Sequence, residues 1–175
     1  MNRTALTGLL IAVSLVAVGC GSSGHTATAS KPQTRATSTT RADPAVALTH
    51  AARTTVTKLH RLSVEVLWRN TLPTGTTRWI RGPALASLRT AAADRRKRGI
   101  RVRLVADDFR ILSVRLDPSY ASATAVARGQ QRVRPYGRDG QPLGHVVVLD
   151  ERARIDLRRI GTSNRFVAWR VVALH

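Results

Sequence analysis

Four side chains are of types that carry out general acid–base chemistry: Glu65, Asp107, Asp108 and Tyr136. A carboxylate in an apolar pocket can remove a proton, while an acidic group opposite it stabilises the developing oxyanion. Asp107 and Asp108 are adjacent, so in a strand they would face opposite sides and at most one could enter a pocket. The alternative, which we favour, is that Asp107 and Asp108 lie in a loop and pair with nearby arginines such as Arg103 and Arg110, and that Glu65 pairs with Arg61 or Arg69. We therefore expect no catalytic site.

The sequence offers less support for a metal or cofactor site than for acid–base chemistry. The histidines show no metal-ligand spacing, and the sequence contains no Ser-His-Asp arrangement and no glycine-rich phosphate loop. We expect neither a metal nor a cofactor. A lone cysteine also excludes an internal disulfide.

That cysteine, Cys20, follows a short export signal. Arg3 is the only charge before an apolar run at residues 5–18. A 14-residue helix rises about 21 Å, whereas the hydrocarbon core of a bilayer is roughly 30 Å thick, so we do not expect a permanent span. The ending Ala17-Val18-Gly19-Cys20 resembles the bacterial lipobox, although Ala17 stands where that motif usually has Leu. The resemblance implies that Cys20 is lipidated; the alternative is an ordinary signal peptide.

The chain is strongly basic. Its 175 residues include 29 Lys and Arg but only 10 Asp and Glu, a formal charge of +19. Such a field attracts anionic partners. With aromatic residues at 4% and no nucleic-acid-binding motif, we expect an anionic membrane surface or envelope polymer rather than nucleic acid. The alternative, a compositional excess of arginine that only solvates the surface, stays open. The expected focus of anion binding is a run of bases: Arg95, Arg96, Lys97, Arg98, Arg101 and Arg103.

Two helices are expected to open the folded part. Asp43-Pro44 combines a preferred N-cap with a preferred first helical residue, and apolar residues then recur at helical spacing to about residue 70. After a break at residues 72–75, a second helix starts at Pro83 and ends at Gly99.

Beyond Gly99 the apolar period changes from 3.6 to 2, which predicts strands. A turn at Asp139-Gly140 predicts a hairpin. In the last strand, Trp169 is expected to pack against the first helix. The predicted strand segments are residues 101–104, 112–116, 121–133, 152–158 and 167–173. Helices followed by four to five antiparallel strands make an α+β domain.

This order of elements, with Gly99-Ile100-Arg101-Val102, a strand of ATAVA type and a closing FVAWRVV, resembles the nuclear-transport-factor-2-like (SnoaL-like) domains. Polyketide-cyclase-like proteins, ketosteroid isomerases and many actinobacterial lipoproteins share that layout. The resemblance covers residues 43–175 and implies a cone, in which N-terminal helices pack in a curved antiparallel sheet.

Together these patterns predict three regions: a lipoprotein signal peptide at residues 1–19, a lipidated Cys20 with a Ser/Thr-rich tether to residue 42, and the cone-shaped domain at 43–175. We expect an extracytoplasmic, lipid-anchored, non-enzymatic module that binds an envelope protein or an anionic envelope component. The alternative is a small-molecule pocket binder or a cofactor-independent isomerase or cyclase. The sequence leaves a homodimer open.

Overall fold

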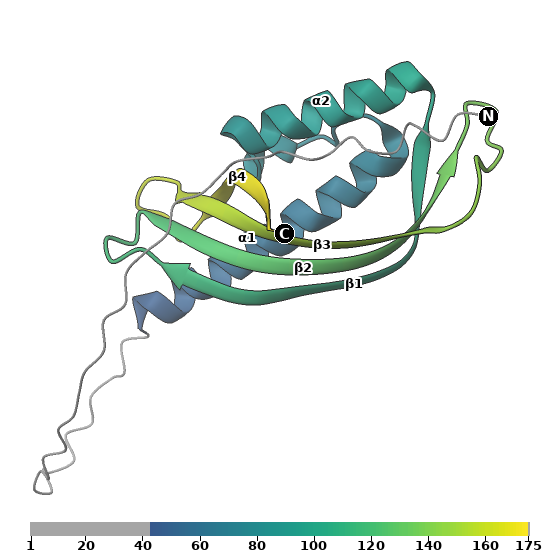
Figure 1. Cartoon of the computed structure of the whole chain (residues 1–175). Coiled ribbons are helices and arrows are strands. Elements are labelled where there is room, and N and C mark those ends of the chain that lie inside the picture. Colours follow the sequence, from purple (N-terminus) through teal and green to yellow (C-terminus); the bar gives the residue numbers. More distant parts are fainter. Residues whose placement is uncertain (1–42, 175) are drawn as a thin grey trace, which may run out of the picture. The chain divides into compact units, whose positions relative to one another are not determined.

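The computed structural model describes residues 43–174, which form two helices followed by four strands (Figure 1). The predictions for the signal peptide, Cys20 and the tether concern residues 1–42, outside the described part. Among residues 43–174, no helix has both the length and the apolar character needed to cross a bilayer.

Both helices have the ends that the sequence predicts. In α1 (Pro44–Arg69), the Asp43 carboxylate accepts a hydrogen bond from the Ala45 amide at 2.8 Å, and Pro44 occupies the first turn. A short 3₁₀ turn at Thr76–Arg78 fills the predicted break. Helix α2 (Gly82–Arg98) starts one residue before the predicted Pro83 and ends at Gly99 in the left-handed conformation, φ 69°.

The strands form one antiparallel sheet in the order β1-β2-β3-β4, so each strand pairs with the next along the chain. The bounds are β1 (Arg101–Leu116), β2 (Ser122–Tyr136), β3 (Val147–Arg159) and β4 (Phe166–Leu174). The predicted α+β class of helices followed by antiparallel strands is confirmed, and the sheet has four strands, within the predicted four to five.

The prediction of separate strands at 101–104 and 112–116 is wrong, because β1 runs through both segments. The register skips Val105 and Leu112, which have no partner on β2. Each extra residue shifts the inside–outside alternation by one, which the sequence pattern reads as a break. A strict period of 2 would place Leu112 on one face with Val114 and Leu116, but the extra residue leaves it 48% exposed.

A register shift also corrects the prediction for Trp169. Asp156 pairs with Arg170 and Leu157 pairs with Ala168, so Trp169 has no partner on β3. Trp169 does not pack against α1; its indole lies against Gly82, at the start of α2.

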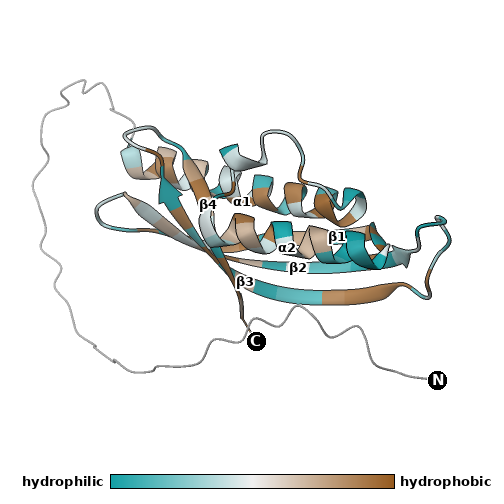
Figure 2. Ribbon diagram, turned by 90° about the horizontal axis from the view of Figure 1, so that it is seen from above, coloured by the Kyte–Doolittle hydropathy of each residue, from teal (hydrophilic) through white to brown (hydrophobic). Residues whose placement is uncertain are grey.

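Helix α1 packs on one face of the sheet because β2 presents small side chains there. Ala123, Ala125 and Ala127 are almost fully buried under Leu48, Ala52 and Val56 of α1, and their small size allows the helix close to the strand. A second buried cluster centres on Ile80, Ala84 and Leu85 and packs against partly buried leucines of α1. Both helices lie on the same side of the sheet (Figures 1 and 2), so neither described helix covers the other side.

Buried Asn70 joins three elements. It ends α1 in the left-handed conformation with φ 54°. Its side-chain amide donates to the Ile100 carbonyl, just before β1, at 2.6 Å. From α2, Arg95 donates to its side-chain oxygen at 3.1 Å and Arg96 to its backbone carbonyl at 2.7 Å. Burial lowers the pKa of the Arg95 guanidinium, with a further contribution from Arg98.

Replacing Asn70 should therefore destabilise the whole domain. For Asn70→Ala we expect a loss of about 3 kcal/mol of unfolding free energy, because two buried groups lose partners and alanine is disfavoured at positive φ. Urea unfolding monitored by circular dichroism measures this loss. The control Asn164→Ala removes an exposed side chain with one long hydrogen bond of 3.5 Å, and should change stability by less than about 0.5 kcal/mol. Equal stability of the two variants would contradict the role of Asn70.

Candidate anion-binding face of the sheet

The sheet face opposite the helices, called the outer face here, carries rows of arginine. Arg110 of β1 lies opposite Arg128 of β2, and Arg128 lies opposite Arg152 of β3. Directly opposed residues on one face have Cβ atoms about 5 Å apart, and like charges in such positions repel. The row of three guanidinium groups therefore lowers the stability of the fold.

Carboxylates from the neighbouring row offset part of this repulsion. Asp108 accepts two hydrogen bonds from Arg110 at 2.9 and 3.0 Å, and Asp150 accepts two from Arg128 at 2.9 and 2.6 Å. These bonds raise the pKa of both arginines, and the Arg128 guanidinium lowers the pKa of Asp150. Arg152 makes no ion pair within the described residues.

Arginines on the outer face outnumber its acids. The register and the alternation of side chains place three carboxylates there: Asp108, Asp150 and Asp156. They also place ten exposed arginines there: Arg101, Arg103, Arg110, Arg115, Arg128, Arg132, Arg152, Arg154, Arg158 and Arg170. The excess positive charge faces solvent, since neither helix covers this side (Figure 1).

The structure divides the predicted basic run between two roles. Arg95 and Arg96 bind Asn70, and Arg98 donates to the Asp94 carbonyl of its own helix at 3.4 Å. Lys97 is exposed on α2, and its carbonyl accepts from Arg138. Arg101 and Arg103 are exposed at the start of β1, and both belong to the outer face. Most of the outer-face arginines were not singled out from the sequence, because their alignment depends on the strand register.

The four acid–base candidates do not share a site. Glu65 pairs with Arg69 at 3.1 Å, and Asp108 pairs with Arg110. Tyr136 makes an edge-to-face contact with Trp68, with ring centroids 5.8 Å apart. Asp107 is directed to the opposite face from Asp108, as expected for neighbours in a continuous strand. The expectation that the two aspartates lie in a loop is wrong, because β1 includes both.

Asp107 has a partner that the sequence did not reveal. Its carboxylate lies 2.6 Å from Nε2 of His60 on α1, and the imidazole stacks on Phe109 with centroids 3.9 Å apart. Gln131 donates to the other carboxylate oxygen at 3.4 Å. The carboxylate orients the imidazole, but among residues 43–174 no hydroxyl or thiol bonds to this histidine and no group of three metal ligands forms. Because the two partners are 47 positions apart in the sequence, the contact left no local signal.

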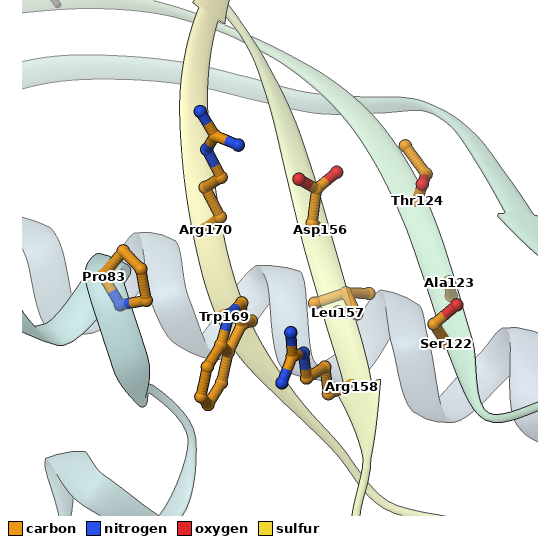
Figure 3. A pocket seen from close by; sticks show the side chains of 9 residues that line it. All are labelled: Pro83, Ser122, Ala123, Thr124, Asp156, Leu157, Arg158, Trp169 and Arg170. Atoms are coloured by element: carbon orange, nitrogen blue, oxygen red, sulfur yellow. The ribbon is translucent and has the colours of Figure 1, made fainter.

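Two shallow depressions lie on the outer face. The larger, of about 380 Å³, lies between Arg158, Trp169 and Arg170, beside the start of α2 (Figure 3). The smaller, of about 280 Å³, lies by the Val105 bulge and includes Arg132 and Val148. In Figure 2 the start of β3, which contains Val148, is hydrophobic and the segment after it is hydrophilic.

Comparisons with known proteins give the fold alone. No family model matches the chain, and no curated protein matches it. Among solved structures, the chain is similar to the crystal structure of the intermembrane space region of the chloroplast protein ARC6, with 12% sequence identity and a TM-score of 0.58. The match covers 72% of this chain and 95% of that one. At this identity the likeness shows a common architecture and does not extend to activity or partners.

The Arg128–Asp150 pair predicts a specific titration. In the folded chain the Asp150 carboxyl should titrate below the ordinary aspartate range, and Arg128→Gln should raise its pKa toward that range. Because the folded pKa is the lower one, the pair stabilises the fold above the ordinary range, and this contribution is lost as the pH falls through the folded value. Carbon-detected NMR of ¹³C-labelled aspartate measures the shift.

Asp117 provides the control for that titration. Its pKa is also lowered, but by hydrogen bonds from Ser119, so Arg128→Gln should leave it unchanged. An Asp150 pKa that does not move in Arg128→Gln would contradict the pair.

Proposed function

We propose that this chain is a membrane-anchored lipoprotein of the bacterial cell envelope, and that its outer face binds an anionic envelope component. The observation that carries the proposal is the excess of ten exposed arginines over three carboxylates on the sheet face that neither described helix covers. Evenly spaced cations on a rigid sheet match a surface or polymer that carries repeated negative charges.

The anchor in this proposal is a lipid on Cys20. It rests on the sequence of residues 1–20, where a short positive segment and an apolar run precede the cysteine. Two or more acyl chains hold a protein stably on a bilayer, whereas one holds it marginally. Residues 21–42, rich in Ser and Thr, would then tether the domain on the extracytoplasmic side. In that compartment an anionic lipid surface or polymer is the expected partner rather than nucleic acid.

We further propose that the domain is of the nuclear-transport-factor-2-like, cone-shaped type. The support is the curved sheet with both helices on its inner side (Figure 1). In such a cone the inner face can hold a pocket, but here α1 packs directly onto the alanines of β2. This filled inner face favours a binding module that works through its outer face.

An enzymatic alternative rests on one observation. The His60–Asp107 pair lies on the inner side with both side chains partly exposed, at 15% and 26%. A cofactor-independent isomerase or cyclase, or a small-molecule binder, would use this pair as its polar group. If His60→Gln abolished binding of a small ligand that Arg152→Gln left unchanged, this alternative would replace the proposal.

The anchor predicts a mass difference at Cys20. Intact mass spectrometry of membrane fractions should show a diacylglyceryl increment on the wild-type chain, starting at Cys20, and Cys20→Ala should lack it and leave the membrane. Identical unlipidated masses for the two chains would refute the lipid anchor.

The outer face predicts position-dependent binding to an anionic polymer. The triple variant Arg110→Gln, Arg128→Gln and Arg152→Gln should weaken binding to heparin, used as a soluble probe. Each base at an anionic surface contributes about 1 kcal/mol, so three should weaken binding by roughly a hundredfold at low salt. Surface plasmon resonance at several salt concentrations measures both the affinity and the slope of its salt dependence.

The matched control removes the same charge from the opposite side. Arg53, Arg61 and Arg89 are exposed on the two helices, and their replacement by glutamine lowers the net charge equally. We expect this control to weaken binding by less than about tenfold, through the long-range field alone. Equal losses in the two triple variants would show that net charge, rather than the outer face, governs binding.

A further inference from the structure

We propose that the larger depression on the outer face is a binding site for the phosphate group of a small polyol phosphate ester. This inference deepens the proposed function, on which it rests, by naming the chemical unit that an anionic component presents. The depression has Arg158 and Arg170 on its rim, together with Trp169, Asp156, Thr124 and Ser122 (Figure 3).

Arg158 is held in position by an aromatic ring. Its guanidinium lies 3.8 Å from the centroid of the Trp169 ring. On α2, Gly82 approaches the same indole so closely that a Cβ atom there would lie 2.8 Å from it. Contact with the ring fixes the plane of the guanidinium while leaving its N–H edge free, which is the geometry that binds phosphate with two parallel hydrogen bonds. Within residues 43–174, Arg158 makes no ion pair, so its charge lacks a carboxylate partner.

The groups beside Arg158 suit an oxyanion. Ser122 lies directly opposite it on β2, and Thr124 lies on the same face two residues along. Their hydroxyls can donate to phosphate oxygens, and neither donates a hydrogen bond to another described residue. Arg170, on β4, adds a second cation that has no ion-pair partner in the described residues.

One carboxylate on the rim, Asp156, would repel an anion, but it has a partner. Arg154 lies 3.3 Å from its Oδ1 atom on the same strand. With that charge offset, Arg158 and Arg170 leave the depression with a net positive charge.

The volume indicates more than a bare ion. A water molecule takes about 30 Å³ of liquid volume, so about 380 Å³ corresponds to roughly a dozen waters. A phosphate with a three-carbon polyol fits in this space, and the hydroxyls of the polyol can bind the exposed polar rim. The open rim, which combines polar and apolar side chains, indicates modest affinity.

Isothermal titration calorimetry of the full chain in detergent, with sn-glycerol 3-phosphate and with inorganic phosphate, tests the site. We expect saturable one-site binding of both, tighter for the ester, and none of glycerol. Arg158→Gln should weaken binding by at least about tenfold, the usual scale for a charge-assisted hydrogen-bond pair. Arg158→Lys should also lose several-fold, because an ammonium group keeps the charge but not the planar fork.

Arg89→Gln is the matched control, since Arg89 is an exposed arginine on α2, away from the outer face and outside the depression. It should change the affinity less than about twofold through the general field. Thermal unfolding of all variants checks the fold, and Trp169→Phe gives a second test because it removes the larger ring that supports Arg158. Equal losses in Arg89→Gln and Arg158→Gln, or no saturable binding by the wild-type chain, would overturn the site.

Two sources present this phosphate chemistry, a lipid headgroup and a soluble polymer. With the Cys20→Ala chain, displacement of glycerol 3-phosphate by phosphatidylglycerol vesicles indicates the lipid, and displacement by a soluble glycerol phosphate oligomer indicates the polymer. If Arg158→Gln still binds heparin, and neither the wild-type chain nor any variant binds phosphate, the phosphate site is refuted and the proposed function stands. If phosphate binds at Arg158 but no polyanion binds to the arginine row, the proposed function is refuted and the phosphate site stands.

Discussion

The arrangement of this domain depends on the junction at Asn70, where the end of α1, the last turns of α2 and the start of β1 meet. One buried amide satisfies the Ile100 carbonyl, while Arg95 and Arg96 satisfy the oxygen atoms of Asn70. Because backbone groups buried without partners are costly, these bonds fix the direction in which the chain leaves the helices. Both helices are thereby held on one side of the sheet. Arg95 and Arg96, which the sequence suggested for anion binding, thus stabilise the fold.

In the described part of the chain, both helices lie on one side of the four-stranded sheet and leave its other face without a helix. In this chain that face concentrates arginine, with three guanidinium groups in one row. The ion pairs with Asp108 and Asp150 reduce the repulsion but, being exposed, contribute little to stability. The arrangement therefore has no evident benefit to folding, whereas it creates a rigid, positively charged surface. The proposed binding of an anionic partner would explain why the arginines gather on this face.

Features that depend on neighbouring residues could be predicted from the sequence, and features that depend on strand register could not. The caps at Asp43 and Gly99 are local, and the structure confirms them. The bulges at Val105 and Leu112 leave no clear sequence signal, so β1 was divided in two and the arginine rows were not foreseen. The contact between His60 and Asp107 was missed for a related reason, since it joins a helix to a strand through tertiary packing. Arg95 and Arg96 were identified as basic, but their bonds to Asn70 were not.

The central claim is that the arginines of the outer face, rather than the total charge of the chain, contact the anionic partner. Modification of arginines with a dicarbonyl reagent, read by peptide mass spectrometry with and without a bound anionic polymer, tests it most directly. The account predicts that the polymer protects Arg110, Arg128 and Arg152, while Arg53 and Arg89 on the helices react at unchanged rates. Protection spread evenly over both sides, or confined to the helices, would contradict it.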